Sequence, residues 1–447
     1  MKVMKFGGIS VKDASAIRAF ADILKKDPEK KIVVVSAFFG ITDHLRKLTD
    51  LVRKNDSAGA LEQVDIIENV TLKIIEDLEM CKVSTGFSKE KLFELRQLVP
   101  ALTLLGETTP RSIDTILSFG ERISSFVIAD FLNSSGIRTA FLDAALVIST
   151  DSNHTNATVQ MERTEELITK TAVPLFEKND CIITAGFIGR DSLGAITTLG
   201  KGGSDYSASV FATCSKAAVL EIWKEVDGIM TTDPRIVPEA LPVKSLSYTE
   251  ASELAYFGAK VLHPKTIRTT VMAGIPVIVK KTSDPAFQGT EINHEPAETG
   301  RVKAIAFQKD VIVINICSEK MLGTYGFLSR VFDIFTKFKT PVDLITTSEI
   351  NISVTVENNE HIDEIVEELS SFAAVTVSGR VAIISLVGAG IKFAPGIAAR
   401  CFGAHDKVNV LMVSMGASDA NLSIIVHQSE MESSVKLLHH EFFEKRN

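Results

Sequence analysis

The chain has 447 residues, of which 45% are hydrophobic and 23% are charged, and its formal net charge is -8. This length predicts two or three domains, and the composition excludes a mainly disordered chain. The acidic balance argues against nucleic acid or an anionic membrane as a partner, because both require clustered Lys and Arg. No run approaches the roughly 20 apolar residues of a membrane span, and Gly7 and Gly8 come too soon for a secretory signal. Five scattered cysteines without paired spacing favour a reducing cytoplasm and no protein-held metal.

Short β-branched runs alternate with helical stretches from the start of the chain to about residue 285. Several runs are apolar on both faces, as buried parallel strands are, and the segments between them are long enough for crossover helices. The segment from about residue 55 to 110 reads as helical throughout, and the polar stretch 283–301 is typical of a linker. An α/β sandwich is therefore predicted for this part. The expected strands are Lys2–Phe6, Lys31–Ala37, Arg138–Leu142, Cys181–Ala185, Ala218–Trp223 and Pro276–Lys281.

Beyond the linker, the chain repeats itself without a gap at a spacing of 70 residues. Each repeat reads strand, helix, two strands, helix, which suits a small ferredoxin-like module. Because such modules often pair to bury a sheet edge, we expect two modules in tandem. The repeated identities are Gly326 and Gly396, Arg330 and Arg400, Phe332 and Phe402, Lys337 and Lys407, Ser348 and Ser418, Asn351 and Asn421, Ser353 and Ser423, and Val356 and Val426.

Glycine-rich turns follow several of the predicted strands. Lys5 ends the first strand just before Gly7 and Gly8, whose backbone N–H groups can approach an anion. LGKGGSDYSA places Lys201 and Asp205 at the mouth of a helix, where the dipole and free N–H groups favour phosphate or carboxylate. A P-loop pattern and a dinucleotide fingerprint are both missing, and a single Gly-Gly after a strand is more often only a turn. The convergence of several turns is informative, because ligands of open α/β sheets bind at the carboxyl ends of strands.

These loops favour phosphoryl transfer, which requires cations that spread the charge on the moving group. Lys5 is the candidate cation, and Asp205 is the candidate acid for orienting a Mg-nucleotide or a donor lysine. Glu121 lies on an otherwise apolar helix, where a surface ion pair with Arg122 is the alternative interpretation. The TTDPR segment is equally compatible with an Asx-turn before proline. His263 in GAKVLHPKT is more often structural than catalytic in such a setting.

Taken together and in this order, the motifs resemble those of the aspartate kinases. They are KFGG-x-S, VSA-x-x-G-x-T-D, S-x-GE-x-x-S, TLG-x-GGSDYSA, TTDPR, ELAYFGAKVLHP and IPV-x-VK. The C-terminal repeat is similar to the paired ACT modules of that family, and MLGTYGFLSRVF and VDLITTSE are similar to the lysine-inhibited type. The resemblance runs from Met4 to about residue 440. It implies an amino-acid-kinase (carbamate-kinase-like) three-layer α/β sandwich at 1–298, followed by two ferredoxin-like ACT modules at 299–378 and 379–447.

The implied activity is ATP-dependent phosphorylation of the β-carboxylate of L-aspartate to 4-phospho-L-aspartate, the first step of lysine, threonine and methionine biosynthesis. Mg²⁺ would be held mainly through the nucleotide phosphates, L-lysine would be the feedback inhibitor, and two copies of the chain would pair through their ACT modules as a homodimer. Two alternatives stay open. One is a catalytically weak amino-acid sensor with a degenerate kinase domain, and the other is a kinase for a different acid such as glutamate or N-acetylglutamate.

The resemblance also implies roles for individual residues. Lys5 would stabilise the transferring phosphoryl group, and Asp205 would hold the lysine and the phosphates in place. Glu121 would bind the α-ammonium of aspartate and Lys201 its α-carboxylate. The other substrate-binding residues would be Ser36, Thr42, Phe187 and Ser204. The nucleotide-binding residues would be Gly7, Gly8, Ser10, Gly202, Gly203, Lys224, Glu225, Met230, Arg235 and Lys260. The lysine-binding residues would be Met321, Thr324, Gly326, Phe327, Leu328, Asp343, Thr347, Ser348 and Glu349, among which the two acids can pair an ammonium group.

Several positions depart from the family pattern. Ile9 stands where the family usually has Thr, which removes one hydroxyl near the phosphates. Lys201 stands in place of Arg, and a lysine cannot make the bidentate fork to a carboxylate, so a weaker affinity for aspartate is expected. Lys224, Glu225 and Met230 replace the usual Thr, Asp and Tyr. Because the two catalytic residues are both present, we expect an active enzyme with altered substrate constants.

Overall fold

The computed structural model forms two compact units, the first comprising residues 1–229 and 262–294 and the second residues 230–261 and 295–447. Residues 230–261 therefore pack with the C-terminal part, although they precede the predicted linker. In the portion of the chain that the structure describes, no helix is both long and apolar enough to cross a membrane, and the cytoplasmic location stays a prediction. The structure describes residues 1–80, 82–106, 108–258, 264–296, 298–321, 325–357, 361–405 and 408–445.

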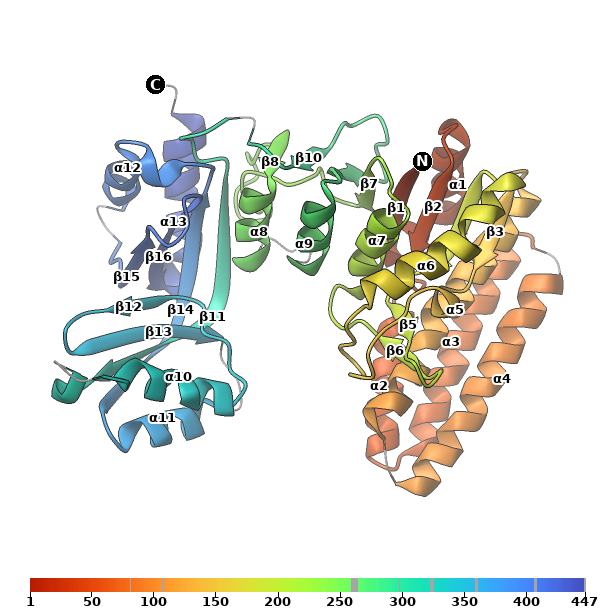
Figure 1. Cartoon of the computed structure of the whole chain (residues 1–447), viewed down its shortest axis with the longest axis horizontal. Coiled ribbons are helices and arrows are strands. Elements are labelled where there is room, and N and C mark those ends of the chain that lie inside the picture. Colours follow the sequence, from red (N-terminus) through yellow and green to blue (C-terminus); the bar gives the residue numbers. More distant parts are fainter. Residues whose placement is uncertain are drawn as a thin grey trace. The chain divides into compact units, whose positions relative to one another are not determined.

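A mainly parallel sheet forms the middle of the first unit (Figure 1), with the strand order β3-β4-β2-β1-β7-β9-β10 and only β10 antiparallel to its neighbour. The six predicted strands are confirmed, with ends that differ by at most two residues. The strands are β1 (Lys2–Phe6), β2 (Lys31–Val35), β3 (Thr139–Leu142), β4 (Cys181–Ala185), β7 (Leu220–Lys224), β9 (Val277–Lys281) and β10 (Thr290–Asn293).

The central position of β1 follows from its packing. The Phe6 ring meets Phe20 of the first helix edge-on with centroids 4.5 Å apart, and it stacks on Trp223 of β7 at 5.5 Å. The neighbouring β2 reads KIVVV and is buried at every position, as expected for a strand covered on both faces. Because β2 and β7 flank β1, the strand order reverses there, and the carboxyl ends of strands at such a point are where ligands bind.

Helices pack against this sheet and complete the α/β sandwich that the sequence predicts. The long helix α5 packs on β2, β3 and β4, whereas α7 packs on β1, β2 and β7. A small antiparallel hairpin, β5 (Ile188–Arg190) with β6 (Ile196–Thr198), precedes α7. The helices are α1 (Ala14–Lys26), α2 (Ile41–Arg53), α3 (Ser57–Asp77), α4 (Lys82–Leu105), α5 (Pro110–Ser134), α6 (Met161–Thr171), α7 (Gly203–Cys214) and α9 (Pro264–Ala273).

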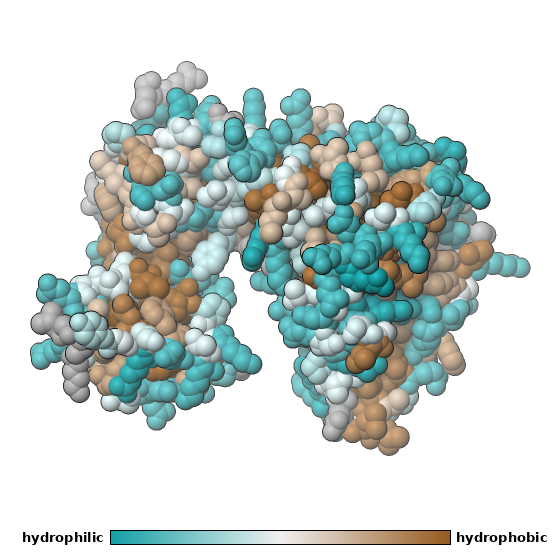
Figure 2. Space-filling view, in the orientation of Figure 1, coloured by the Kyte–Doolittle hydropathy of each residue, from teal (hydrophilic) through white to brown (hydrophobic). Residues whose placement is uncertain are grey.

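The helical character predicted for residues 55–110 is confirmed over the described residues, where α3 and α4 pack side by side. Arg96 of α4 joins the two helices, because its guanidinium lies 2.5 Å from Asp65 and 3.1 Å from Glu68 on α3. Leu104 and Leu105 remain exposed near the end of α4, and Figure 2 shows apolar surface where this helix ends.

The second unit contains the predicted tandem repeat, which is confirmed in its element order and spacing. The first helix of each repeat, α10 and α12, has a glycine N-cap, Gly326 and Gly396, with φ of 82° and 85°, a conformation that favours glycine. The elements are β8 (Ser245–Ser247), α8 (Tyr248–Tyr256), β11 (Ala304–Cys317), α10 (Phe327–Lys337), β12 (Ile345–Thr347), β13 (Asn351–Glu357), α11 (Ile362–Ser370), β14 (Ala374–Val387), α12 (Ile397–Ala404), β15 (Met412–Met415), β16 (Asn421–His427) and α13 (Met431–His439).

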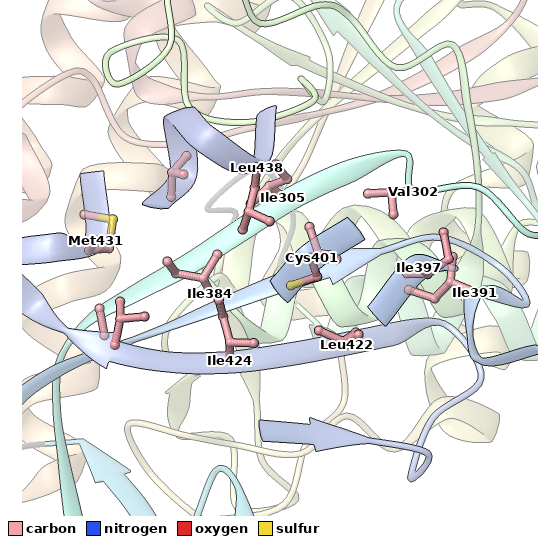
Figure 3. Packing of buried hydrophobic residues seen from close by; sticks show 14 of the residues in the cluster. Val302, Ile305, Ile384, Ile391, Ile397, Cys401, Leu422, Ile424, Met431 and Leu438 are labelled. Atoms are coloured by element: carbon pink, nitrogen blue, oxygen red, sulfur yellow. The ribbon is translucent and has the colours of Figure 1, made fainter. Parts of the chain in front are cut away.

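One antiparallel sheet joins the two modules in the order β12-β13-β11-β14-β16-β15. Its two central strands, β11 and β14, have 14 residues each and serve both modules. Ile305 at the start of β11 packs with Ile384, Ile424 and Leu438 in the core of the second module (Figure 3). Ile314, further along the same strand, packs in the core of the first module. The modules therefore share strands, an arrangement that the repeat alone did not indicate.

Candidate active site

Three charged side chains from three elements meet at the carboxyl ends of the central strands. Lys5 Nζ on β1 lies 2.6 Å from Asp205 Oδ1 on α7, and Lys224 Nζ at the end of β7 lies 3.0 Å from Asp205 Oδ2. Lys5 and Asp205 are both buried. The parallel register that sets Lys5 beside Ile222 brings the two lysines to the same end of the sheet. The structure thus brings together the two residues predicted to be catalytic.

Charge balance in this cluster favours the ionised carboxylate. Burial alone would raise the pKa of Asp205, but Lys5 and Lys224 outweigh it and lower that pKa to about 2. Burial and the nearby Lys5 lower the pKa of Lys224, and Asp205 opposes this shift. Two ammonium groups thus share one carboxylate and leave an excess of positive charge, which suits the phosphates of a nucleotide.

The α7 N-terminus supplies backbone donors next to these side chains. Gly202 caps the helix with φ of 73°, and Asp205 lies in the first turn. A Cβ on Gly186, which follows β4, would lie 2.7 Å from Ser204 Cβ, and a Cβ on Gly203 would lie 2.7 Å from the Phe187 ring. Glycine at these positions therefore lets the β4 end approach the helix start closely, as a phosphate-binding loop requires.

Phe187, a predicted substrate residue, has an unusual backbone conformation. Its φ is 71°, a region that residues other than glycine rarely adopt. The Phe187 N–H donates to Ser207 Oγ at 2.9 Å, and the Phe187 carbonyl accepts from Leu199 N–H at 2.9 Å. These bonds hold the strained residue between the β4 end and the start of α7, and strain of this kind concentrates at functional sites.

Glu121 is a buried carboxylate in the middle of α5, and its side chain makes no ion pair with Arg122 among the described residues. Burial raises the pKa of Glu121 to about 7, although the backbone N–H of Ala37 and the more distant Arg46 and Lys5 lower it. Its Oε2 is buried without a hydrogen-bond partner in the described part of the chain. The surface interpretation is therefore wrong, and an unpaired buried oxygen of this kind is suited to a cationic ligand group.

The turn after β2 lies beside Glu121. Ser124 Oγ donates to the carbonyl of Ser36 at 2.9 Å and to that of Glu121 at 3.2 Å. Gly120 packs so closely that a Cβ there would lie 2.9 Å from Ala37 Cβ. Thr42, the remaining predicted substrate residue of this region, lies in the first turn of α2. Lys201 lies exposed in the loop before α7.

The predicted nucleotide residues fall into several groups. Gly7 and Gly8 follow β1, and a Cβ on Gly7 would lie 3.6 Å from Lys5 Nζ. Ser10 is buried, with its hydroxyl 2.9 Å from Thr282 Oγ1, and Glu225 is exposed just after β7.

The remaining predicted nucleotide-binding residues lie outside the described residues of the first unit. Met230 and Arg235 are in the second unit, and Lys260, like His263, lies outside the described residues. Arg235 pairs with Asp233, whose carboxylate also accepts from the Arg235 N–H at 2.9 Å. This is the Asx-turn that the TTDPR segment allows.

The predicted lysine-binding residues cluster around two elements of the first module. Gly326, Phe327 and Leu328 start α10, Thr347 ends β12, and Ser348 and Glu349 form the turn to β13, while Met321 ends a short 3₁₀ helix and Thr324 lies outside the described residues. Asp343 comes just before β12.

The Asp343 carboxylate is partly satisfied. Tyr256 Oη donates to its Oδ1 at 3.2 Å, and its Oδ2 is buried without a hydrogen-bond partner among the described residues. Burial raises the pKa of Asp343 to about 6; the Tyr256 hydrogen bond lowers it, and the charge of Glu357 raises it. Like Glu121, Asp343 is a buried carboxylate whose ionised form a bound ammonium group would stabilise.

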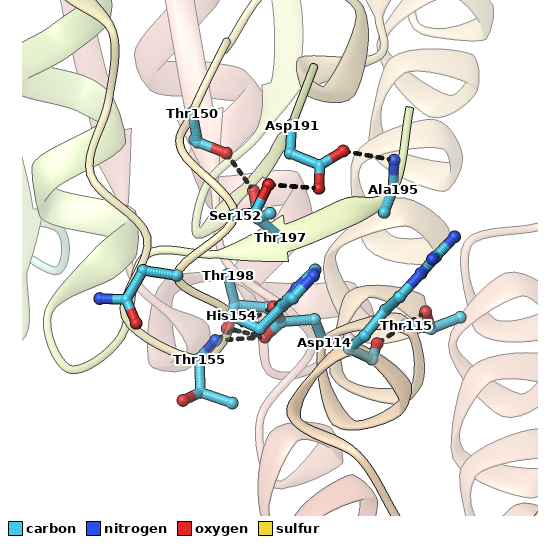
Figure 4. Close-up of polar contacts among 12 residues, drawn as sticks. Asp114, Thr115, Thr150, Ser152, His154, Thr155, Asp191, Ala195, Thr197 and Thr198 are labelled. Atoms are coloured by element: carbon cyan, nitrogen blue, oxygen red, sulfur yellow. Dashed lines mark hydrogen bonds and ion pairs between the residues drawn. The ribbon is translucent and has the colours of Figure 1, made fainter. Parts of the chain in front are cut away.

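A buried polar network that the sequence did not reveal connects α5 with the end of β6 and with the loop that carries His154 and Thr155 (Figure 4). Asp114 of α5 is fully buried and accepts from His154, the Thr155 N–H and Thr198 Oγ1. The sequence feature that could have indicated this network is the position of Asp114, an acid two helical turns before Glu121 on the same apolar helix. Over the described residues, no group of three or more His, Cys, Asp or Glu side chains could hold a metal ion.

Comparison with known proteins agrees with this geometry. The sequence profile of the amino acid kinase family matches residues 1–281, and that of the ACT domain matches residues 314–366 and 384–442. Aspartokinase 1, chloroplastic, of Arabidopsis thaliana is 35% identical over 461 residues, covering 99% of this chain and 80% of that protein. The lysine-sensitive aspartokinase 3 of Escherichia coli (strain K12) is 33% identical over 455 residues, covering 99% of both.

A solved structure matches over the same extent. The crystal structure of E. coli aspartokinase III in complex with aspartate and ADP has a TM-score of 0.87 and 32% identity, and the match covers 99% of this chain and 100% of that one. By its fold and by these matches, the chain belongs to the amino acid kinase family, and within that family to the aspartokinases.

Proposed function

We propose that the protein transfers the γ-phosphoryl group of ATP to the β-carboxylate of L-aspartate. The observation that carries this proposal is the buried Lys5–Asp205–Lys224 cluster at the carboxyl ends of β1 and β7. It supplies positive charge where a phosphoryl group would move. Glu121, whose buried Oε2 has no hydrogen-bond partner within the described parts of the chain, supplies a negative charge for an α-ammonium. Support also comes from the relatives named aspartokinase and from the aspartate and ADP bound to the E. coli enzyme.

In this mechanism a β-carboxylate oxygen attacks the γ-phosphorus in line, and the bond to the β,γ-bridging oxygen breaks to release ADP. The attacking carboxylate is already ionised at neutral pH, since its pKa is near 4, so no side chain has to remove a proton. Lys5 neutralises charge on the transferring group, while Asp205 holds the two lysines at the correct place. Catalysis therefore consists of positioning and electrostatic stabilisation.

The cluster also fits Mg²⁺ bound to the nucleotide. Asp205 already has an ammonium group on each oxygen, so the metal would take most of its ligands from the phosphates, next to the N–H groups of Gly202 and Gly203. When bound, Mg²⁺ would neutralise charge on the β- and γ-phosphates. Lys5 and Lys224 would keep the phosphates against the α7 N-terminus, which favours anions in the same way.

We propose L-lysine as the inhibitor, bound near Asp343 in the first ACT module, with a homodimer formed through the ACT modules. Support comes from Asp343 Oδ2, which is buried without a hydrogen-bond partner among the residues that the structure describes, and from the relative named lysine-sensitive. Tyr256, which donates to Asp343, ends α8, and the segment that follows α8 includes the predicted nucleotide residue Lys260. An effector whose ammonium group binds the Asp343 carboxylate would compete with the Tyr256 hydroxyl for that carboxylate. Its binding would therefore affect Tyr256 at the end of α8.

A hydroxamate assay tests the proposed activity. Purified protein with ATP, Mg²⁺ and L-aspartate should release ADP and form an aspartyl hydroxamate when hydroxylamine is present. Lys5→Ala should reduce turnover by at least about a hundredfold with little change in folding. The control Lys47→Ala, which removes an exposed lysine of α2, should leave turnover unchanged. A folded sample that produces neither ADP nor hydroxamate would exclude the proposal.

The same samples separate the alternatives. A degenerate sensor, which the replacements at Ile9, Lys201 and Met230 favour, would bind lysine in a calorimeter without turnover. A kinase for another acid would prefer glutamate or N-acetylglutamate to aspartate in a substrate panel.

A further inference from the structure

The buried network around Asp114 joins the two parts of the first unit that carry the proposed aspartate-binding charges. Asp114 precedes Glu121 by seven residues on α5, which places both on one face of the helix, about 10 Å apart along its axis. Thr198, which ends β6, is three residues before Lys201. A side chain on α5 that binds the end of β6 therefore influences the separation of Glu121 from Lys201.

The Asp114 carboxylate uses both oxygens. Thr198 Oγ1 donates to Oδ1, and the Thr155 N–H lies 3.1 Å from Oδ1 and 3.0 Å from Oδ2. His154 Nδ1 lies 2.7 Å from Oδ2 and is the donor, because a carboxylate only accepts. Figure 4 shows these donors converging on the carboxylate from the β6 end and from the loop 151–157. The side chain of Asp114 is fully buried, so water cannot replace a lost donor.

The loop that carries His154 and Thr155 is in turn packed against the segment before Lys201. The Ala157 N–H donates to the Thr198 carbonyl at 2.9 Å. Gly200 has φ of 75°, and a Cβ there would lie 2.9 Å from Asn156 Oδ1 and 3.1 Å from the Thr155 carbonyl oxygen. This close approach leaves the two segments little freedom to move separately.

Thr155 is held in a conformation that it would not adopt alone. Its φ is 70°, which is a rare value for a β-branched residue. The N–H of this residue is the one that both Asp114 oxygens accept. A strained residue persists only where its surroundings determine its conformation, so the carboxylate helps to hold the Thr155 end of the loop in place.

A second set of polar contacts anchors the other end of the loop. Thr150 Oγ1 lies 2.7 Å from Thr197 Oγ1, and Ser152 Oγ donates to Asp191 Oδ2 at 2.9 Å. Asp191 also accepts from the Ala195 N–H at 2.8 Å within the β5–β6 hairpin. These contacts connect the loop to the hairpin but not to α5, so Asp191 offers a matched carboxylate for comparison.

We propose that Asp114 is a positioning residue for the aspartate site, which sets the β6–α7 loop, and with it Lys201, at a defined distance from Glu121. The inference rests on the proposed function. Asp114 does not contact the substrate; it acts through Thr198, Thr155 and His154. The substrate would span the two charges with its α-ammonium and α-carboxylate, and a loop that moves by about 1 Å loses much of that fit.

The test compares Asp114→Asn with Asp191→Asn in steady-state assays. Asp114→Asn keeps an oxygen for the Thr155 N–H but loses one acceptor and the charge. We expect it to raise the KM for aspartate about tenfold or more, with kcat and the KM for ATP changed less than about threefold. Asp191→Asn should leave the KM for aspartate unchanged. Thr198→Val should give a smaller increase than Asp114→Asn, and Thr198→Ser should restore the original value.

A double-mutant cycle tests whether Asp114 affects aspartate binding through Lys201. In a Lys201→Ala background, Asp114→Asn should raise the KM for aspartate less than about twofold further, because interacting residues are not additive. Additive effects, or equal effects of the two Asn variants, would overturn the proposal.

Amide hydrogen exchange gives a readout that does not need turnover. Asp114→Asn should speed exchange at residues 199–203 relative to Asp191→Asn, while the second half of α5 keeps its protection. If the unaltered protein does not phosphorylate aspartate, the proposed function fails, and exchange at 199–203 still decides the role of Asp114. Equal exchange in the two variants would refute it.

Discussion

Protonation of Glu121 should control the affinity for aspartate. The pKa of this buried carboxyl is about 7 in the free protein instead of 4.5, a shift of roughly 2.5 units that corresponds to about 3 kcal/mol. An α-ammonium binds the ionised form, so aspartate must displace a proton whenever the pH is below about 7. We expect the KM for aspartate to rise about fivefold from pH 7 to pH 6 and about ninefold from pH 6 to pH 5, with kcat at saturation nearly constant.

The assay is ADP release at several aspartate concentrations from pH 5 to pH 8. Neither the substrate β-carboxylate, with a pKa near 4, nor Asp205, with a pKa of about 2, titrates in this window. Glu121→Gln should show a high KM that no longer depends on pH there. A KM that stays flat between pH 5 and pH 7 in the unaltered protein would refute the reasoning.

The same shift has a consequence for stability. The folded pKa of Glu121 is raised above its unfolded value, so the folded state binds the proton more tightly. Stability conferred by this group is therefore present below about pH 4.5 and is lost as the pH rises to about 7. Relative to Glu121→Gln, the free energy of unfolding in urea should fall by about 3 kcal/mol across that window. Equal slopes for the two proteins would contradict the burial of an unpaired carboxyl.

Two further predictions concern ligand affinity. Lys201→Arg should lower the KM for aspartate severalfold with little change in kcat, because arginine makes a bidentate contact with a carboxylate; an unchanged KM would remove Lys201 from that role. The pKa of Asp343 is about 6, so calorimetric lysine affinity should fall about tenfold per pH unit below pH 6, and Asp343→Asn should abolish that dependence. Lysine affinity that is the same at pH 5 and pH 7 would contradict this assignment.

Local sequence patterns were sufficient for much of the fold. The apolar runs around Lys5 and in KIVVV predicted the strands that lie at the centre of the sheet, because burial on both faces requires continuous apolar residues. The 70-residue repeat predicted two modules, and the structure shows that its repeated glycines, Gly326 and Gly396, are helix N-caps. Glycine at a positive φ and apolar periodicity are local requirements, so they can be read directly from the chain.

Contacts between distant residues needed the tertiary structure. The spacing around Glu121 suggested an ion pair with Arg122, whereas packing of α5 buried the carboxylate instead. The buried network of Asp114 could not be predicted from the sequence, because its three hydrogen-bond donors belong to residues 40 or more positions away. Nothing in a local pattern records which donors a fold will bring to a buried acid.

The sequence by itself determined the elements of this protein, its repeat and the residues with charge suited to phosphoryl transfer. The resemblance already implied that Asp205, 200 positions along the chain, holds Lys5, and the tertiary structure shows their contact. Only the tertiary structure gave Asp343 its Tyr256 partner and divided β11 between two cores. The physical reason is that helix and strand formation depend on near neighbours. The electrostatics of a site, in contrast, depend on burial and on charges that only the packed chain brings together.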